Sequence, residues 1–337
     1  MTFLKTCIPE NYKSVLGIYD TQKAIGILHS IFEDELSAKL HLRRVSAPLF
    51  VDAASGLNDD LNGVERPVSF DMTCSGKSAQ VVHSLAKWKR MALKNYNFYP
   101  GNGLYTDMNA IRRDEELDNL HSVYVDQWDW EKVITREERN IDYLKETVNS
   151  IVGAICDTHA TLKAMFPALT RTLDRNVSFV TSQELEDMWR DKTPKEREDL
   201  YLKEHKTAFI MQIGGRLRSG EKHDGRAPDY DDWRLNGDIM FWNDTLGHAI
   251  EISSMGIRVD PETLDRQLSE AGCDDRRALP FHKMLLNNEL PLTIGGGIGQ
   301  SRLCMLLLEK AHIGEVQVSS WDVYTVEECN KKGVMLL

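Results

Sequence analysis

Hydrophobic and polar positions alternate at helical spacing in three parts of the chain. In residues 21–40 the apolar residues fall largely on one stripe, and acids and lysines fill the rest. The same pattern predicts a long helix in residues 137–165 and a shorter, basic helix in residues 84–94. These segments supply amphipathic helices that need a partner layer.

Two capping boxes predict further helix starts near the middle of the chain. Thr181 is followed three residues later by Glu184, and Thr193 by Glu196. Pro194 stands at the first helical position after Thr193, where its missing N–H costs nothing.

Short β-branched and aromatic runs predict the strands. They occur at 45–51, 121–130 and 208–213, and at 238–242 and 249–253, which a turn at 243–247 joins. Pro48 removes a ladder donor, so the strand at 45–51 is expected at an edge or an interface. The strands cluster without regular strand–helix alternation, which favours an α+β fold with an antiparallel sheet. No linker stands out, so we expect one domain over residues 1–337.

Composition narrows the functional classes. The 337 residues carry 41 Lys+Arg against 52 Asp+Glu, a net charge of −11, and 42% are hydrophobic. This is a globular composition, and its acidity argues against a nucleic-acid partner. No apolar run is long enough to span a membrane, and no secretory signal is recognisable. Six scattered cysteines without a Cys-x-x-Cys pair indicate free thiols and a cytoplasmic protein.

The glycine-rich run at 295–302 is the most informative segment. It lacks the Gly-Lys-Ser/Thr ending of a Walker A loop, and Arg302 stands where a dinucleotide fingerprint needs its third glycine. What remains is Gly297-x-Gly299-x-x-Arg302, leading into an apolar helix at 303–308. The glycines would let a flat ligand approach the backbone, and the guanidinium would stack on a base or hold phosphate oxygens. The alternative is a glycine-rich turn with a surface arginine.

Two other segments carry charges suited to phosphate and metal chemistry. Arg112 lies in a strand-like run followed by acids, which would suit a bidentate contact to an α-phosphate. Asp238 and Glu251 stand on the two strands predicted to pair, so their carboxylates would converge on an oxygen site suited to Mg²⁺. The alternatives are a solvated loop for the first and an exposed surface pair for the second.

Together these segments resemble motifs 2 and 3 of the class II aminoacyl-tRNA synthetase catalytic fold. Pro48 matches the motif 1 proline, which lies at the dimer interface in that class. More closely, positions 15–325 resemble the ammonia-dependent asparagine synthetase (aspartate–ammonia ligase) family. The stretches that carry this resemblance are 81–90, 121–131, 226–233, 235–239, 253–260 and 293–308.

The resemblance implies a homodimeric, ATP-dependent ligase that joins L-aspartate and ammonia into L-asparagine. The expected intermediate is β-aspartyl-AMP, and the by-products are AMP and pyrophosphate. By motif position, Arg112 should hold the α-phosphate, and Arg302 should stack on adenine or contact the ATP tail. Asp238 and Glu251 should hold Mg²⁺. Further ATP contacts are expected from Gly297, Gly299 and Arg226, and Arg218 and Arg226 border a stretch at 214–225 that could close over ATP.

The resemblance also implies an aspartate clamp. Lys89 and Arg258 match positions that grip the side-chain carboxylate in aspartyl-tRNA synthetases, and here we expect them to grip the α-carboxylate instead. With Arg112, the expected catalytic residues are Asp59 and Gln127. The expected substrate-binding residues are Asp129, Asp231, Ser84 and Ser254. One carboxylate would take a proton from ammonium, and which one stays open. The alternatives are loop capping for Asp59 and pairing with Arg226 for Asp231.

Three other functions compete with this one. An aspartyl- or asparaginyl-tRNA synthetase would need an anticodon-binding domain, for which the chain has no room beyond the catalytic core. A glutamine-dependent enzyme would need a cysteine after the initiator, where Thr2 stands. A non-catalytic amino-acid-binding paralogue would usually lack an arginine or an acid of the set, and all are present.

Overall fold

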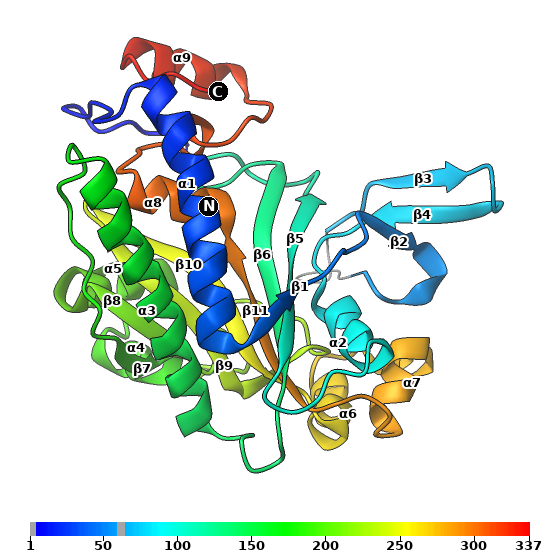
Figure 1. Ribbon diagram of the computed structural model, residues 1–337. Coiled ribbons are helices and arrows are strands. Elements are labelled where there is room, and N and C mark those ends of the chain that lie inside the picture. The colour runs from blue at the N-terminus through cyan, green and yellow to red at the C-terminus, as the bar shows by residue number, and fades with distance from the viewer. Residues whose placement is uncertain (1–4, 59–64) are drawn as a thin grey trace.

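An eight-stranded sheet forms the centre of the computed structural model, which describes residues 5–58 and 65–337 (Figure 1). In spatial order the strands are β1 (Leu42–Arg44), β5 (Gly103–Ile111), β6 (Tyr124–Val133), β11 (Thr293–Gly299), β10 (His248–Arg258), β9 (Asp231–Asn243), β8 (Thr207–Met211) and β7 (Ser178–Thr181). The six strands from β5 to β8 pair antiparallel, and only β1 and β7 join parallel at the edges. The α+β prediction is confirmed.

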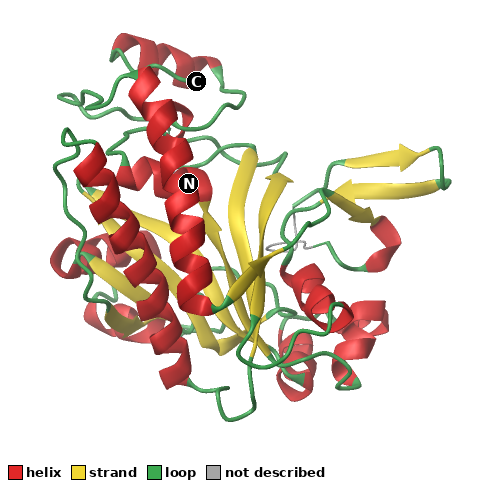
Figure 2. Ribbon diagram, viewed as in Figure 1, coloured by secondary structure: helices red, strands yellow, loops and turns green. Residues whose placement is uncertain are grey.

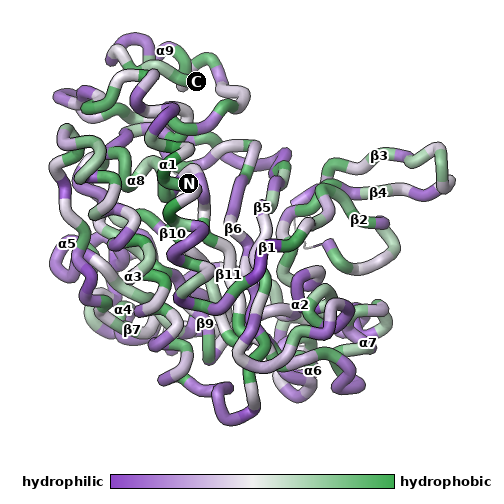
Figure 3. Tube along the Cα trace, in the orientation of Figure 1, coloured by the Kyte–Doolittle hydropathy of each residue, from purple (hydrophilic) through white to green (hydrophobic). Residues whose placement is uncertain are grey.

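Helices cover one face of this sheet along its length. They are α1 (Ile18–Leu40), α3 (Ile141–Met165) and α8 (Gln300–Leu307). The predicted stripe of α1 is its buried face, since Ala24, Leu28, Phe32 and Leu36 have no exposed surface. Figure 3 shows the same one-sidedness as alternating hydrophobic and hydrophilic bands along α1. These side chains form one core cluster with inward residues of β6, β9, β10 and β11.

On the opposite face of the sheet, the helices of the described residues lie at its two ends. At one end, residues of α4 (Ser182–Met188) and α5 (Pro194–His205) pack on β8 and β9 in a separate cluster. Towards the other end lie α2 (Ala86–Asn95), α6 (Pro261–Glu270) and α7 (Pro280–Leu286). The last helix, α9 (Val323–Lys331), lies beyond α1 near the C-terminus. No helix in the described ranges is both long and apolar enough to cross a lipid bilayer.

A second, three-stranded sheet projects to one side (Figure 2). It consists of β2 (Phe50–Asp52), β4 (Lys77–Val81) and β3 (Ser69–Met72) in that order. The predicted strand at 45–51 is therefore wrong. Residues 45–48 are irregular, and separate strands lie on either side of them in different sheets; Pro48, which has no N–H to donate, lies in this irregular stretch.

Both predicted capping boxes are present. In the second, Thr193 Oγ1 accepts from Glu196 N at 3.3 Å while Thr193 N donates to Glu196 Oε2 at 2.8 Å, with Pro194 in the first turn. The predicted paired strands at 238–242 and 249–253 are also present and extend further, as β9 and β10.

Replacing Thr193 by alanine is expected to lower the free energy of unfolding by about 1 kcal/mol, because it leaves a helix N–H without its acceptor. Urea titration measures the change. Thr161→Ala is the matched control, since this exposed threonine bonds only to Asp157 O within its own helix and its loss should change stability by less than about 0.5 kcal/mol. Equal effects would refute the capping role.

Candidate active site

Successive side chains along β6 point alternately to the helix-covered core and to the opposite face of the sheet, where the candidate site lies. Trp128 and Trp130 are fully buried on the helix-covered face, where the ring of Trp128 lies 4.7 Å from that of Phe32. They are core residues. Gln127, Asp129 and Glu131 point to the other face. That face carries the polar side chains of the candidate site.

The glycine-rich run is strand β11, which corrects the alternative of a glycine-rich turn. Gly297 and Gly295 lie opposite Asp129 and Glu131 in the ladder. A Cβ at Gly297 would come within 2.3 Å of Gln127 Oε1, and one at Gly295 within 2.1 Å of Glu131 Oε2. The missing side chains thus make room for the polar groups of β6. Helix α8 begins at Gln300, three residues before the predicted start.

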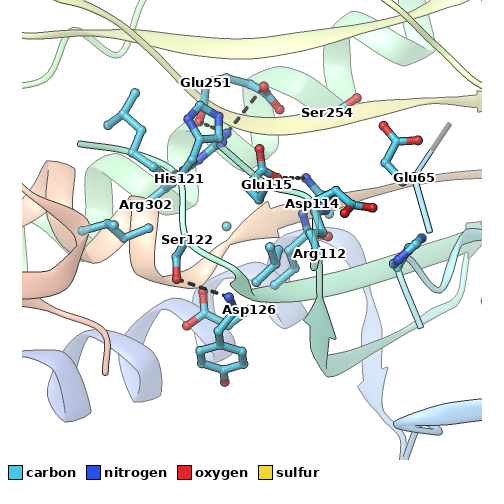
Figure 4. A pocket seen from close by; sticks show the side chains of 18 of the residues that line it. Glu65, Arg112, Asp114, Glu115, His121, Ser122, Asp126, Glu251, Ser254 and Arg302 are labelled. Atoms are coloured by element: carbon cyan, nitrogen blue, oxygen red, sulfur yellow. Dashed lines mark hydrogen bonds and ion pairs between the residues drawn. The ribbon is translucent and has the colours of Figure 1, made fainter. Parts of the chain in front are cut away.

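An open cavity of about 380 Å³ lies on this face, beside the ends of β5 and β6 (Figure 4). Eight of the predicted site residues line it, namely Arg112, Gln127, Arg226, Glu251, Ser254, Gly297, Gly299 and Arg302. Five others, Lys89, Asp129, Asp231, Asp238 and Arg258, are buried and do not line it, and neither does half-buried Ser84. Asp59 lies outside the described residues.

Arg112 follows directly after β5, with its backbone N–H bonded to Val123 O at 2.9 Å. Its side chain is one-quarter exposed, and Nη1 lies 3.7 Å from Glu115 Oε2. Its buried Nε has no hydrogen-bond partner among the described residues. The guanidinium therefore lies at the cavity wall with donors left for an anion.

Arg302 projects from the first turn of α8 towards β10. Its Nη1 lies 3.5 Å from Glu251 Oε2 and donates to Glu251 O at 3.3 Å. Figure 4 shows it beside His121 and Ser122 at the cavity wall. The side chain is largely buried, so its planar head is held in one place along the cavity.

Asp238 and Glu251 lie on neighbouring strands, as predicted. Asp238 faces Ser254, and a β-bulge follows Glu251 in the same ladder. Burial raises the pKa of Asp238 to about 7, with Glu251 adding to the rise and Arg226, its ion-pair partner, opposing it. Burial also disfavours charge on Glu251, but Arg302 and Arg226 hold its pKa below the usual value.

The two carboxylates fit a Mg²⁺ ion that is shared with a phosphate ligand. Asp238 Oδ1 is buried without a hydrogen-bond partner in the described part of the chain, and Glu251 lines the cavity. Mg²⁺ typically takes one or two carboxylates plus substrate phosphates. Among the described residues no group of three or more acids, histidines or cysteines could hold a metal ion.

Beneath the cavity lies a buried charge cluster of Lys89, Asp129, Glu131, Asp231 and Arg258. Lys89 pairs with Asp129 and donates to Gly296 O at 3.0 Å. Arg258 Nη2 lies 2.7 Å from Glu131 Oε2, and its Nη1 lies 2.5 Å from Asp231 Oδ1. Burial lowers the pKa of Lys89 and raises that of Asp231. The predicted partner of Asp231, Arg226, instead pairs with Asp238, so that alternative is corrected.

Sequence reasoning missed Glu131 and Tyr230. Glu131 is fully buried between Arg258 and Lys89. Burial alone would raise the pKa of this carboxyl group, but the two neighbouring cations hold its pKa below the usual value. Its place two residues after Asp129 on a strand was the signal that it shares that face. Tyr230 lines the cavity, and its ring centroid lies 5.8 Å from the Arg258 guanidinium carbon. Arg258 therefore lies just behind this wall.

Arg218 does not reach the cavity. Its Nη1 lies 2.7 Å from Asp187 Oδ2, and its backbone N–H donates to Gln183 Oε1 at 2.8 Å, both on α4. Ser219 Oγ donates to Glu186 on the same helix at 2.5 Å. In this structure the 214–225 stretch is docked on α4 at Arg218, so the idea that Arg218 closes over the nucleotide is not supported.

Comparisons with known proteins place these features in a family. A family model described as "AsnA: Aspartate-ammonia ligase" matches residues 19–333. Proteins named "Aspartate--ammonia ligase" from Clostridium perfringens and Lactobacillus acidophilus are each 58% identical, over 99% of this chain and 99% and 100% of their own lengths.

Solved structures show the same fold at low sequence identity. Asparaginyl-tRNA synthetase from Pyrococcus horikoshii, complexed with asparaginyl-adenylate, superposes with a TM-score of 0.65 at 15% identity, over 89% of this chain and 68% of that one. Aspartyl-tRNA synthetase from Entamoeba histolytica gives 0.58 at 16% identity, over 90% and 58%. The fold is thus that of the class II synthetase catalytic core.

Proposed function

The chain belongs to the aspartate–ammonia ligase family and makes asparagine from aspartate and ammonia, and from this premise we propose the chemical route and the residues that serve it. The β-carboxylate of aspartate attacks the α-phosphorus of ATP, and pyrophosphate leaves. Ammonia then attacks the β-carbonyl of the β-aspartyl-AMP, and AMP leaves. The observation that carries this route is the division of cations on one sheet face, with arginines lining the cavity and a second set buried beneath it.

On the cavity side, Arg112 holds the α-phosphate, where its unsatisfied Nε and its fork stabilise the charge that develops as the bond to pyrophosphate breaks. Arg302 lies along the nucleotide, and Gly297 and Gly299 let the nucleotide approach the strand. Asp238 and Glu251 would hold Mg²⁺, which when bound neutralises phosphate charge. Arg226, paired to Asp238, keeps that carboxylate in place beside the ATP.

On the buried side, Lys89 and Arg258 bind the α-carboxylate of aspartate and leave its β-carboxylate directed at ATP. The cluster contains two cations and three carboxylates, a net charge of −1 when all are ionised. The α-ammonium of the substrate would pair with Asp129 and Asp231 while the cations hold its α-carboxylate, so the zwitterionic α-groups enter without adding net charge. Gln127 and Ser254 line the cavity between the two sides.

Several roles rest on the family resemblance alone. We assign Asp59 to catalysis and Ser84 to hydrogen bonding near the substrate on that basis. We likewise propose that residues 1–337 form one catalytic domain, and that the protein works as a cytoplasmic homodimer. All six cysteines are unpaired, which fits a reducing compartment.

Ammonium is expected to support aspartate-dependent release of AMP and pyrophosphate from ATP, and glutamine is not, because the site has no glutaminase chemistry among its described residues. The measurement follows asparagine, AMP and pyrophosphate with each nitrogen donor, without tRNA. Equal yields of asparagine, AMP and pyrophosphate support the route. Release of ADP and phosphate instead, or a strict need for tRNA, would overturn it.

A further inference from the structure

One buried polar group at the cavity is not used in the route above. Gln317 is 4% exposed and lines the cavity. Its Nε2 donates to Ser301 Oγ at 3.0 Å, whereas its Oε1 has no hydrogen-bond partner among the described residues. A buried acceptor without a partner costs free energy, so a ligand that supplies a donor gains from it.

The orientation of this amide follows from its neighbours. Ser301 Oγ lies 2.5 Å from Asp126 Oδ2, and Ser301 N–H donates to Asp126 Oδ1 at 3.0 Å. An ionised carboxylate only accepts, so the hydroxyl proton of Ser301 is directed to Asp126, and Ser301 Oγ can only accept from Gln317. The NH₂ of Gln317 therefore faces Ser301, and its oxygen is the free end.

Gln317 lies at the Arg302 end of the cavity. It bonds to the residue just before Arg302, and two residues further on Ser319 bonds to Ser122 at 2.7 Å. Ser122 and Arg302 both line the cavity, and Figure 4 shows them with Asp126 on one side of it. Because the proposed function places the base of ATP against Arg302, the free oxygen faces the edge of that base.

We propose that Gln317 is the residue that selects adenine, by accepting a hydrogen bond from the exocyclic 6-amino group of ATP. The inference rests on the proposed function, which places ATP in this cavity. A base with a keto group at position 6, as in guanine or hypoxanthine, would place its keto oxygen against Gln317 Oε1, and neither oxygen can donate a hydrogen bond. Asp126 and Ser301 act as positioning residues, since they determine which end of the amide faces the nucleotide.

The test compares ATP with purine riboside triphosphate, which carries hydrogen in place of the 6-amino group, and with inosine triphosphate. Aspartate-dependent pyrophosphate exchange measures kcat/KM for each. The wild-type protein should prefer ATP to purine riboside triphosphate by about tenfold or more, and inosine triphosphate should be poorer still. Gln317→Leu should lose activity with ATP, keep that with purine riboside triphosphate, and so abolish the preference.

Two further variants keep the test decisive. Gln300→Leu is the matched control, since this buried glutamine donates to Asp107 at 3.3 Å and does not line the cavity, and it should retain the preference. Ser301→Ala removes the anchor of the amide and should weaken the preference even where Gln317→Leu does not fold. An unchanged preference in folded Gln317→Leu or Ser301→Ala protein overturns the inference. Loss of all exchange in the wild type would instead refute the proposed function.

Discussion

Replacing Arg112 by alanine is expected to lower aspartate-dependent pyrophosphate exchange by about 10³-fold or more, the range that a single arginine supplies in phosphoryl transfer. The protein should remain folded. Its side chain makes one long ion pair, at 3.7 Å to Glu115, and its Nε bonds to nothing in the described ranges, so little structure depends on it. Such an arginine is positioned for a ligand rather than for the fold.

The measurement separates chemistry from binding by following both the exchange rate and the KM for ATP. The rate should fall much more than the KM rises, because the contact strengthens as charge develops on the phosphate. Arg112→Lys keeps the positive charge but loses the planar guanidinium that can donate two parallel hydrogen bonds, so it should recover only a small part of the rate. Arg175→Ala is the control, an arginine paired with Asp157 outside the cavity. Near-normal exchange in Arg112→Ala would contradict the assignment.

Much of the fold was predictable because local patterns and tertiary packing agree. The stripe of α1 is its buried face, the capping boxes begin α4 and α5, and 238–242 and 249–253 pair as expected. The site face followed from the period of two along β6, which sends the tryptophans to the core and Gln127 and Asp129 away from it.

What could not be predicted depends on contacts between segments far apart in the sequence. A glycine-rich turn was one local interpretation of the 295–302 run. It forms a strand because it pairs with β6 and β10, and its residues are glycines there because Gln127 and Glu131 fill the space that side chains would take. Lys89 and Arg258 are buried beneath the cavity beside Glu131, whose negative charge compensates theirs. The two cations in turn keep Glu131 ionised in spite of its burial. Pro48 indicated a strand at an edge or an interface, but not that one strand ends at Arg44 in the large sheet and the next begins at Phe50 in the small one.

The aspartate clamp gives the second large effect. Arg258→Ala is expected to lower kcat/KM for aspartate by about a hundredfold or more, because the α-carboxylate loses a buried, hydrogen-bonded cation. The KM for ATP should change far less, since Arg258 lies behind the cavity wall and, among the described residues, its guanidinium bonds to Glu131 and Asp231. Initial rates over a grid of both substrates measure the two constants together.

The same burial makes stability part of this experiment. Without Arg258, the carboxylates of Glu131 and Asp231 remain buried with no arginine between them, at a cost of about 3–5 kcal/mol. Arg258→Lys keeps a positive charge there and should be more stable than Arg258→Ala. A lysine cannot donate to Glu131 and Asp231 from one planar group as the guanidinium does, so the KM for aspartate should still rise.

Glu309→Gln separates a general loss of stability from a specific loss of the clamp. Glu309 is a buried acid that accepts from the backbone of Thr170 and Arg171 at 2.6 and 2.8 Å, and it does not line the cavity. This variant should also be less stable, but both substrate KM values should stay near those of the wild type. If Arg258→Lys raises the two KM values equally, or if Glu309→Gln raises that for aspartate as much, then Arg258 supports the fold and does not hold the α-carboxylate.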